Sequence, residues 1–200
     1  RDPTGFLRQE YEALVNQSLD WKIRTVRGPS APHSNVAGKD VTMLCSNNYL
    51  NLSNHPRLKR AAIQAARAYG AGSGSVRPIA GTMDLHEELE RRIARFKNRE
   101  AALFYMSGFA TNAGLIPQLV GEGDTIITDE LNHGSIIDGC RLTKAQRLIY
   151  KHCDMGELDR VLQEADRSSR RILVISDGVF SMDGDVAPVD QIVKTAEPFG

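Results

Sequence analysis

Apolar residues follow two patterns along this chain, one with helical spacing and one in short continuous runs. The segment "PRLKRAAIQAARAYG" places Leu58, Ala62 and Tyr69 on one face of a helix, and "DLHEELERRIARF" repeats this spacing. The runs "AALFYM", "DTIITD", "RLIY" and "ILVIS" are typical of buried strands, and a helix-forming stretch separates each from the next. This alternation predicts an α/β domain with a mainly parallel sheet and helices on both faces.

The first forty residues depart from this pattern. The segment "FLRQEYEALVNQSLDW" has the spacing of an N-terminal helix, and "RGPSAPHSNVAGKD" is rich in Pro, Gly and Ser. Such a composition predicts an extended linker. We therefore expect a helical arm over residues 1–40 and the N-terminal portion of a larger domain over residues 41–200.

Composition narrows the choice of partners. The 25 acidic and 25 basic residues cancel, which argues against binding to nucleic acid or a membrane surface. We see neither an apolar run long enough to span a bilayer nor a signal peptide. The three cysteines are odd in number and lack ligand spacing, so we expect reduced thiols in a cytoplasmic protein and no metal site.

The glycine-rich stretch "YGAGSGSVRPIAGT" (residues 69–82) raises the question of a dinucleotide site. That fingerprint needs a strand before its glycines, whereas here a helix runs into Gly70. We expect Gly70 to end this helix and Gly72 and Gly74 to allow a tight loop. A plain flexible connector is the alternative, although it leaves Arg77 unexplained.

A better anion site lies at "LFYMSGFATNAG", where an expected strand ends at Met106 and a helix follows. Ser107 is a natural N-cap, and Gly108 lets a ligand approach the free N–H groups and the positive end of the helix dipole. The alternative is an ordinary capped helix. Phe109 is then either a core residue or a ring lying beside a flat cofactor.

Two further segments place polar residues after expected strands, where α/β folds bind ligands. "ITDELNHGSIIDG" contains Asp129, His133 and Ser135, and "VISDGVFSMDGDVAP" contains Asp177, Ser181, Asp183 and Asp185. Taken alone, His133 could be a structural histidine, and Asp183-Gly184-Asp185 could be a plain turn or a metal loop, although it lacks the longer acidic series and terminal Glu of an EF-hand calcium loop.

The tripeptide "HCD" (residues 152–154) contains three residue types that can bind a metal ion. Adjacent residues point in different directions, however, so we interpret this tripeptide as a strand end followed by a helix cap.

Together these stretches resemble one family, the pyridoxal-phosphate-dependent α-oxoamine synthases of fold type I. The matching segments "SNNYLNLSNHP", "GAGSGSVRPIAGT", "SGFATN", "DELNHGSIIDG" and "DGVFSMDGDVAP" occur in family order. The resemblance implies the fold-type I large domain and condensation of an amino acid, most simply glycine, with an acyl-CoA thioester and loss of CO2. "SVRPIAGT" and "DELNHGSIIDGCRLTKA" look most like glycine C-acetyltransferases, with 8-amino-7-oxononanoate synthases (alanine and a pimeloyl thioester, in biotin synthesis) as the alternative.

The resemblance also implies roles for individual residues. His133 would stack on the cofactor ring as a catalytic residue near the substrate carboxylate. The other cofactor contacts would be Ser107, Gly108, Phe109 and Ser181. Asn47 would lie near the amino-acid substrate, and Arg24 is our candidate for an arm arginine that faces it.

The chain departs from the family at a few positions. Asn51 stands where glycine is usual, and asparagine tolerates the left-handed conformation. None of Lys144, Lys151 and Lys194 stands in the motif of the Schiff-base lysine, which we expect beyond residue 200 in the C-terminal part of the enzyme. We expect a homodimer; an inactive partner subunit and another fold-type I enzyme, such as an aminotransferase, remain alternatives.

Overall fold

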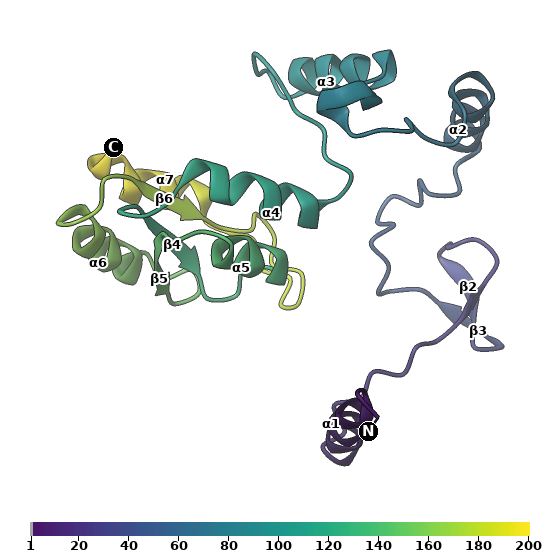
Figure 1. Ribbon diagram of the computed structural model, residues 1–200, viewed down its shortest axis with the longest axis horizontal. Coiled ribbons are helices and arrows are strands. Elements are labelled where there is room, and N and C mark those ends of the chain that lie inside the picture. Colours follow the sequence, from purple (N-terminus) through teal and green to yellow (C-terminus); the bar gives the residue numbers. More distant parts are fainter. Residues whose placement is uncertain (1) are drawn as a thin grey trace. The chain divides into compact units, whose positions relative to one another are not determined.

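The computed structural model describes residues 2–200, which form two compact units, residues 2–84 and Leu85–Gly200 (Figure 1). The first unit contains the expected N-terminal helix and a small antiparallel sheet with the strand order β1-β2-β3. Its elements are α1 (Gly5–Asn16), β1 (Val26–Arg27), β2 (His33–Val36), β3 (Lys39–Thr42), α2 (Pro56–Tyr69) and a π-helical turn, η1 (Arg77–Gly81).

The expectation of an extended linker before residue 40 is wrong, because this stretch folds back on itself as antiparallel strands. Asn35 of β2 pairs with Asp40 of β3 across a two-residue turn at Ala37 and Gly38. These turn residues have φ of 52° and 83°, as in the type I′ turns that close tight hairpins. The expected boundary after residue 40 falls inside β3, and the division into an arm and a large domain stays a prediction.

The glycine-rich stretch after α2 is a self-contained loop. Gly70 has a φ of 82°, and its N–H donates to a carbonyl of the last turn of α2, which confirms that it ends the helix. A Cβ at Gly81 would lie 2.0 Å from the carbonyl oxygen of Ser75, so only glycine fits there. The Thr82 hydroxyl donates to the Arg77 carbonyl at 2.8 Å and closes the loop. The strand–glycine–helix order of a dinucleotide site is therefore absent from this stretch.

The second unit contains a parallel sheet with the strand order β5-β4-β6, as the sequence predicts. Helices α4 and α5 cover one face of the sheet, and α6 and α7 cover the other (Figure 1). The elements are α3 (Asp84–Phe96), α4 (Gly108–Leu119), β4 (Thr125–Asp129), α5 (Gly134–Arg141), β5 (Gln146–Tyr150), α6 (Met155–Asp166), β6 (Ile172–Ile175), α7 (Val189–Ala196) and the 3-10 turn η2 (Glu197–Phe199).

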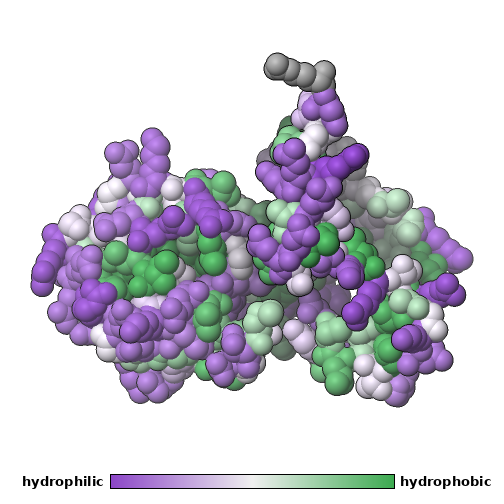
Figure 2. Space-filling model, turned by 90° about the horizontal axis from the view of Figure 1, so that it is seen from below, coloured by the Kyte–Doolittle hydropathy of each residue, from purple (hydrophilic) through white to green (hydrophobic). Residues whose placement is uncertain are grey.

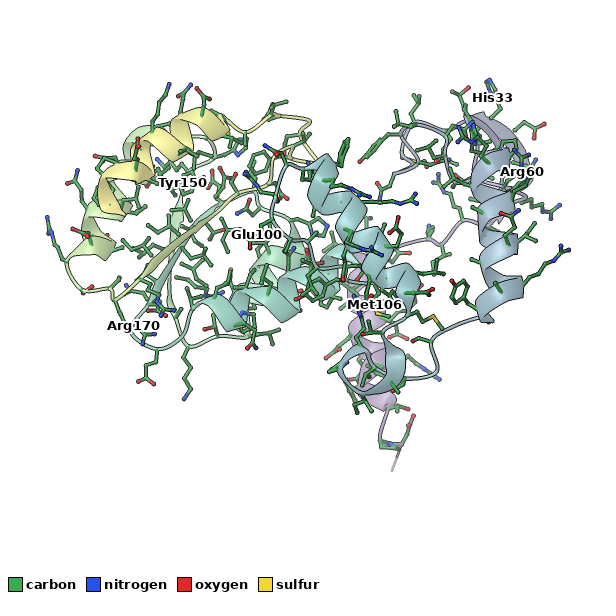
Figure 3. The ribbon with its side chains drawn as sticks, turned by 90° about the horizontal axis from the view of Figure 1, so that it is seen from above. His33, Arg60, Glu100, Met106, Tyr150 and Arg170 are labelled. Carbon is green, nitrogen blue, oxygen red and sulfur yellow. The ribbon has the colours of Figure 1, made fainter. Side chains whose placement is uncertain are left out.

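The core of this unit lies on both faces of the sheet. Neighbouring residues of β4 point to opposite faces, and both Ile126 and Ile127 are fully buried. Ile126 packs with the apolar residues of α4 and α5, whereas Ile127 packs with those of α6 and α7. Tyr150 and Phe180 are buried in this second cluster (Figure 3 labels Tyr150).

The segment 101–106, "AALFYM", is not the strand that its composition predicts. Within residues 2–200 it pairs with no strand, and β5 and β6 already occupy both edges of β4. The N–H of Phe104 instead donates to the Glu90 carboxylate at 2.8 Å. Helix α4 therefore follows an irregular extended segment rather than a strand.

Large apolar side chains remain exposed on both units, and Figure 2 shows them as green areas between hydrophilic ones. Trp21, Ile23, Leu44 and Met182 are each more than nine-tenths exposed. Apolar surface of this extent is typical of interaction surfaces. Among the described residues, none of the helices combines the length and apolar character needed to cross a bilayer.

Candidate functional site

The carboxyl ends of β4 and β6 are joined by hydrogen bonds from Asn132. Its Nδ2 donates to the Ile175 carbonyl at 2.8 Å, and its Oδ1 accepts from the Asp177 N–H at 2.7 Å. The Asp177 carboxylate in turn accepts from the His133 N–H at 2.6 Å. The two polar segments singled out in the sequence thus meet at the edge of the sheet where parallel folds bind ligands. Asn132, which the sequence analysis did not single out, makes this junction.

The His133 imidazole is held in one orientation by α5 and α4. Its Nδ1 accepts from the Ser135 N–H at 3.1 Å and lies 2.7 Å from Ser135 Oγ, so His133 caps α5. Ser135 Oγ accepts from Asn112 Nδ2 of α4 at 2.9 Å. A backbone N–H can only donate, so Nδ1 is an acceptor and the neutral ring carries its proton on Nε2. No acceptor for this Nε2–H lies among residues 2–200, so it is available to a ligand.

The N-terminus of α4 is open to an anion. Ser107 Oγ accepts from the Ala110 N–H at 3.1 Å, which confirms the expected cap. In the described part of the chain, the N–H groups of Gly108 and Phe109 have no acceptor. A Cβ at Gly108 would meet nothing within 4 Å, and the Phe109 ring is 57% exposed and so lies outside the core. These features fit a phosphate group at a helix N-terminus.

Helices α4 and α5 are in close contact at Gly139. A Cβ there would lie 2.7 Å from the carbonyl oxygen of Asn112 and 2.9 Å from Ile116 Cδ1. This contact brings Asn112 within hydrogen-bond distance of Ser135. The close approach of the two helices therefore supports the orientation of His133.

Ser181 is exposed at the tip of a turn that the core anchors. Phe180 is buried, its N–H donates to the Asp185 carbonyl at 2.8 Å, and its carbonyl accepts from the Gly184 N–H at 2.7 Å. The convergence of Ser181 with His133 stays a prediction. Arg24 and Asn47 are exposed residues of the first unit, and their contacts with substrate also stay predictions.

A second polar cluster surrounds the buried carboxylate of Asp129. His152 Nδ1 lies 3.0 Å from Asp129 Oδ1, and His152 Nε2 lies 3.3 Å from Asp185 Oδ2. The hydrogen bond to Asp129 raises the pKa of His152. Burial, followed by the charges of Asp129 and Asp185, raises the pKa of Cys153.

The expectation that residues 152–154 point apart is partly wrong. The Cys153 Sγ lies 3.6 Å from His152 Nε2, so these two side chains approach each other. Asp154 does point elsewhere and caps α6, as expected, by accepting from the Glu157 N–H at 2.9 Å. The third group of the cluster is Asp129, which the sequence places at a strand end facing a ligand crevice but does not link to His152 and Cys153.

The parallel sheet with helices on both faces and the open helix N-terminus at its edge form an α/β domain of the fold-type I class. The chain belongs to the aminotransferase class I and II family, whose model matches residues 39–198. Among solved structures, Sphingomonas wittichii serine palmitoyltransferase superposes with a TM-score of 0.87 at 29% identity, covering 100% of this chain and 50% of that one. Serine palmitoyltransferase from S. paucimobilis with pyridoxal phosphate and myriocin bound gives 0.88 at 28% identity, with coverages of 100% and 51%.

Curated relatives narrow the resemblance. The 8-amino-7-oxononanoate synthase of Symbiobacterium thermophilum is 54% identical over 197 residues, which is 98% of this chain and 50% of the relative. That of Thermoanaerobacter pseudethanolicus is 52% identical over 194 residues, with coverages of 97% and 49%. The chain spans about half the length of these relatives. The resemblance to α-oxoamine synthases is confirmed, and these names favour the alternative over the glycine C-acetyltransferase interpretation.

Proposed function

We propose that this chain forms the N-terminal half of an 8-amino-7-oxononanoate synthase, which joins alanine to a pimeloyl thioester with loss of CO2. This proposal rests on the sequence identity of 54% and 52% to two synthases of this name over nearly the whole chain. The segments required for the α-oxoamine synthase resemblance all lie within this match.

The residues described here fit the phosphate end of the cofactor. The free N–H groups of Gly108 and Phe109 would bind the phosphate, with Ser107 holding the first turn of α4 in shape. When bound, pyridoxal phosphate supplies an electron sink for the carbanion at the substrate α-carbon. Binding energy at the phosphate would then hold the distant reacting bond in position. We propose that Ser181 adds a further cofactor contact.

His133 is proposed to orient both the cofactor and the substrate. An imidazole stacked on one face of the cofactor ring fixes its tilt and leaves the opposite face free for proton transfer. The Nε2–H of His133 has no acceptor among residues 2–200 and would donate to the substrate carboxylate. Asn47 and Arg24 are proposed to bind the amino-acid substrate. We also propose a cytoplasmic homodimer, which the exposed apolar surface supports.

Glycine and acetyl-CoA form a second candidate substrate pair. The stretches "SVRPIAGT" and "DELNHGSIIDGCRLTKA" favour it, because they look most like glycine C-acetyltransferases. The two candidates differ in the amino acid and in the length of the acyl chain. They share the residues proposed for the cofactor.

The test is a substrate matrix with the full-length protein and pyridoxal phosphate. Alanine and glycine are each paired with pimeloyl and acetyl thioesters, and the products are identified by mass spectrometry. We expect the highest kcat/KM with alanine and the pimeloyl thioester. A preference for glycine with acetyl-CoA would select the second candidate, and no product from any pair would overturn the proposal.

The variant His133→Ala tests the role of the imidazole. We expect turnover to fall more than cofactor retention, because the phosphate anchor at α4 remains while the ring loses its stacking partner. Cofactor content is measured by absorbance and turnover with the best substrate pair. Turnover equal to that of the wild type would contradict a catalytic role for His133.

A further inference from the structure

Three side chains of different chemistry meet at the carboxyl end of β4 without a part in the proposed reaction. They are Asp129 at the end of β4 and His152 and Cys153 in the turn between β5 and α6. One donor atom from each lies within 4.8 Å of the other two. A carboxylate oxygen, an imidazole nitrogen and a thiol sulfur form a donor set that suits Zn²⁺.

We propose that Asp129, His152 and Cys153 form a binding site for a borderline-soft divalent cation, of which Zn²⁺ is the prime example. The site would hold the cation through Asp129 Oδ1, His152 Nδ1 and Cys153 Sγ.

The separations between these atoms suit one tetrahedral cation once the Cys153 side chain turns towards His152 Nδ1, because its Sγ lies 3.6 Å from Nε2, nearer than to Nδ1. His152 Nδ1 lies 3.0 Å from Asp129 Oδ1 and 3.8 Å from Cys153 Sγ. A cation about 2.0 Å from the oxygen and the nitrogen and about 2.3 Å from the sulfur would subtend angles of about 100° and about 125° over these separations. These angles lie on either side of the tetrahedral value. Three protein ligands leave the fourth position open to water.

The surroundings of the ligands are those of a supported metal site. Asp129 is 2% exposed, and the N–H groups of Leu131 and Cys153 donate to its carboxylate at 2.9 Å each, which fixes its orientation. The other nitrogen of His152, Nε2, lies 3.3 Å from Asp185 Oδ2. A carboxylate that accepts from the free ring N–H is the usual partner of a metal-bound histidine.

The cation would replace protons that these groups hold without it. Binding releases the thiol proton of Cys153 and the proton that His152 Nδ1 shares with Asp129. The cation would then connect β4 to the turn before α6. His152 would remain in contact with Asp185, which belongs to the turn that carries Ser181.

The test uses the full-length protein, freed of metal by chelation and dialysed against Zn²⁺ or Co²⁺. Bound Zn²⁺ is counted by atomic emission, and a sulfur-to-cobalt charge-transfer band in the Co²⁺ spectrum reports thiolate ligation. Cys153→Ser removes the proposed sulfur ligand. Cys45→Ser is the matched control, since it removes an exposed thiol whose nearest polar contact is Met43 Sδ at 3.7 Å. Asp185→Asn tests the outer carboxylate.

We expect one Zn²⁺ per chain and a charge-transfer band in the wild type and in Cys45→Ser. Cys153→Ser should lose the band and bind Zn²⁺ at least about tenfold more weakly, and Asp185→Asn should keep the band with about ten- to a hundredfold weaker binding. The wild-type spectrum decides the proposal even if a variant folds poorly. Absence of the band there, or a band that survives in Cys153→Ser, would overturn it.

Discussion

The close approach of α4 and α5 can be tested by adding one methyl group, through Gly139→Ala. The new Cβ would lie 2.7 Å from the Asn112 carbonyl oxygen and 2.9 Å from Ile116 Cδ1. Reaching ordinary contact requires the helices to separate by roughly 0.5–0.7 Å. Overpacking of this kind costs about 1–3 kcal/mol, and the better helix propensity of alanine offsets about 1 kcal/mol. We therefore expect a net destabilisation of up to about 2 kcal/mol, measured by urea unfolding of the full-length protein.

Gly156→Ala in α6 is the matched control. Its Cβ would meet only Asp154 Oδ1, at an ordinary 3.4 Å, so the helix propensity gain of about 0.5–1 kcal/mol should remain. The two substitutions are chemically identical and should shift the urea midpoint in opposite directions. If Gly139→Ala is stabilised as much as Gly156→Ala, the helices do not meet as described, and the support that they give to His133 fails with them.

Two further predictions concern polar contacts. Asp124 accepts two hydrogen bonds of 2.9 Å from Arg170 (Figure 3 labels Arg170), and this pairing lowers the pKa of Asp124 to about 2. The contribution of the pair to the free energy of unfolding should therefore be complete above pH about 4 and lost as the pH falls towards 2. In Asp124→Asn, the free energy of unfolding should therefore fall less between pH about 4 and 2 than in the wild type. An unchanged pH dependence would contradict the role of the Asp124–Arg170 pair. Ser135→Ala should lower kcat with unchanged cofactor content, because it removes the hydroxyl that links Asn112 to His133. Ser135→Thr keeps a hydroxyl and should restore kcat. An equal loss of kcat in both variants would indicate a packing effect instead.

Much of the second unit could be predicted from local sequence pattern. The apolar runs of β4, β5 and β6 and the caps at Ser107 and Asp154 are visible in the sequence, because each depends on neighbours within a few positions. The segment 101–106 has equally strong strand character but no partner within residues 2–200. Strand composition predicts extended backbone, whereas pairing depends on whether an edge is free. The sequence analysis did not predict the hairpin of β2 and β3, because its two-residue turn at Ala37 and Gly38 lies within a stretch whose composition is typical of a linker.

The candidate site was less accessible to sequence reasoning, because its geometry depends on contacts between distant segments. His133 could be singled out from its position after a strand. Its tautomer, however, follows from Ser135 and from Asn112 of another helix. Asn132 has no local signature beyond preceding a histidine, although it joins two strands. Asp129 could not be assigned to a cluster with His152 until the parallel pairing of β4 and β5 brought their ends together.

The two polar systems at the carboxyl end of the sheet are connected through one turn. Asp177 accepts from the His133 N–H at one end of this turn, and Asp185 contacts the His152 ring at the other end. A bridge between Val179 and Val186 closes the turn, and Ser181 lies at its tip. Occupation of the proposed cation site would therefore restrain the turn that carries Ser181. Because Ser181 is proposed to contact the cofactor, we expect cation binding to change cofactor affinity, measured by titrating the full-length protein with pyridoxal phosphate in the presence and absence of Zn²⁺.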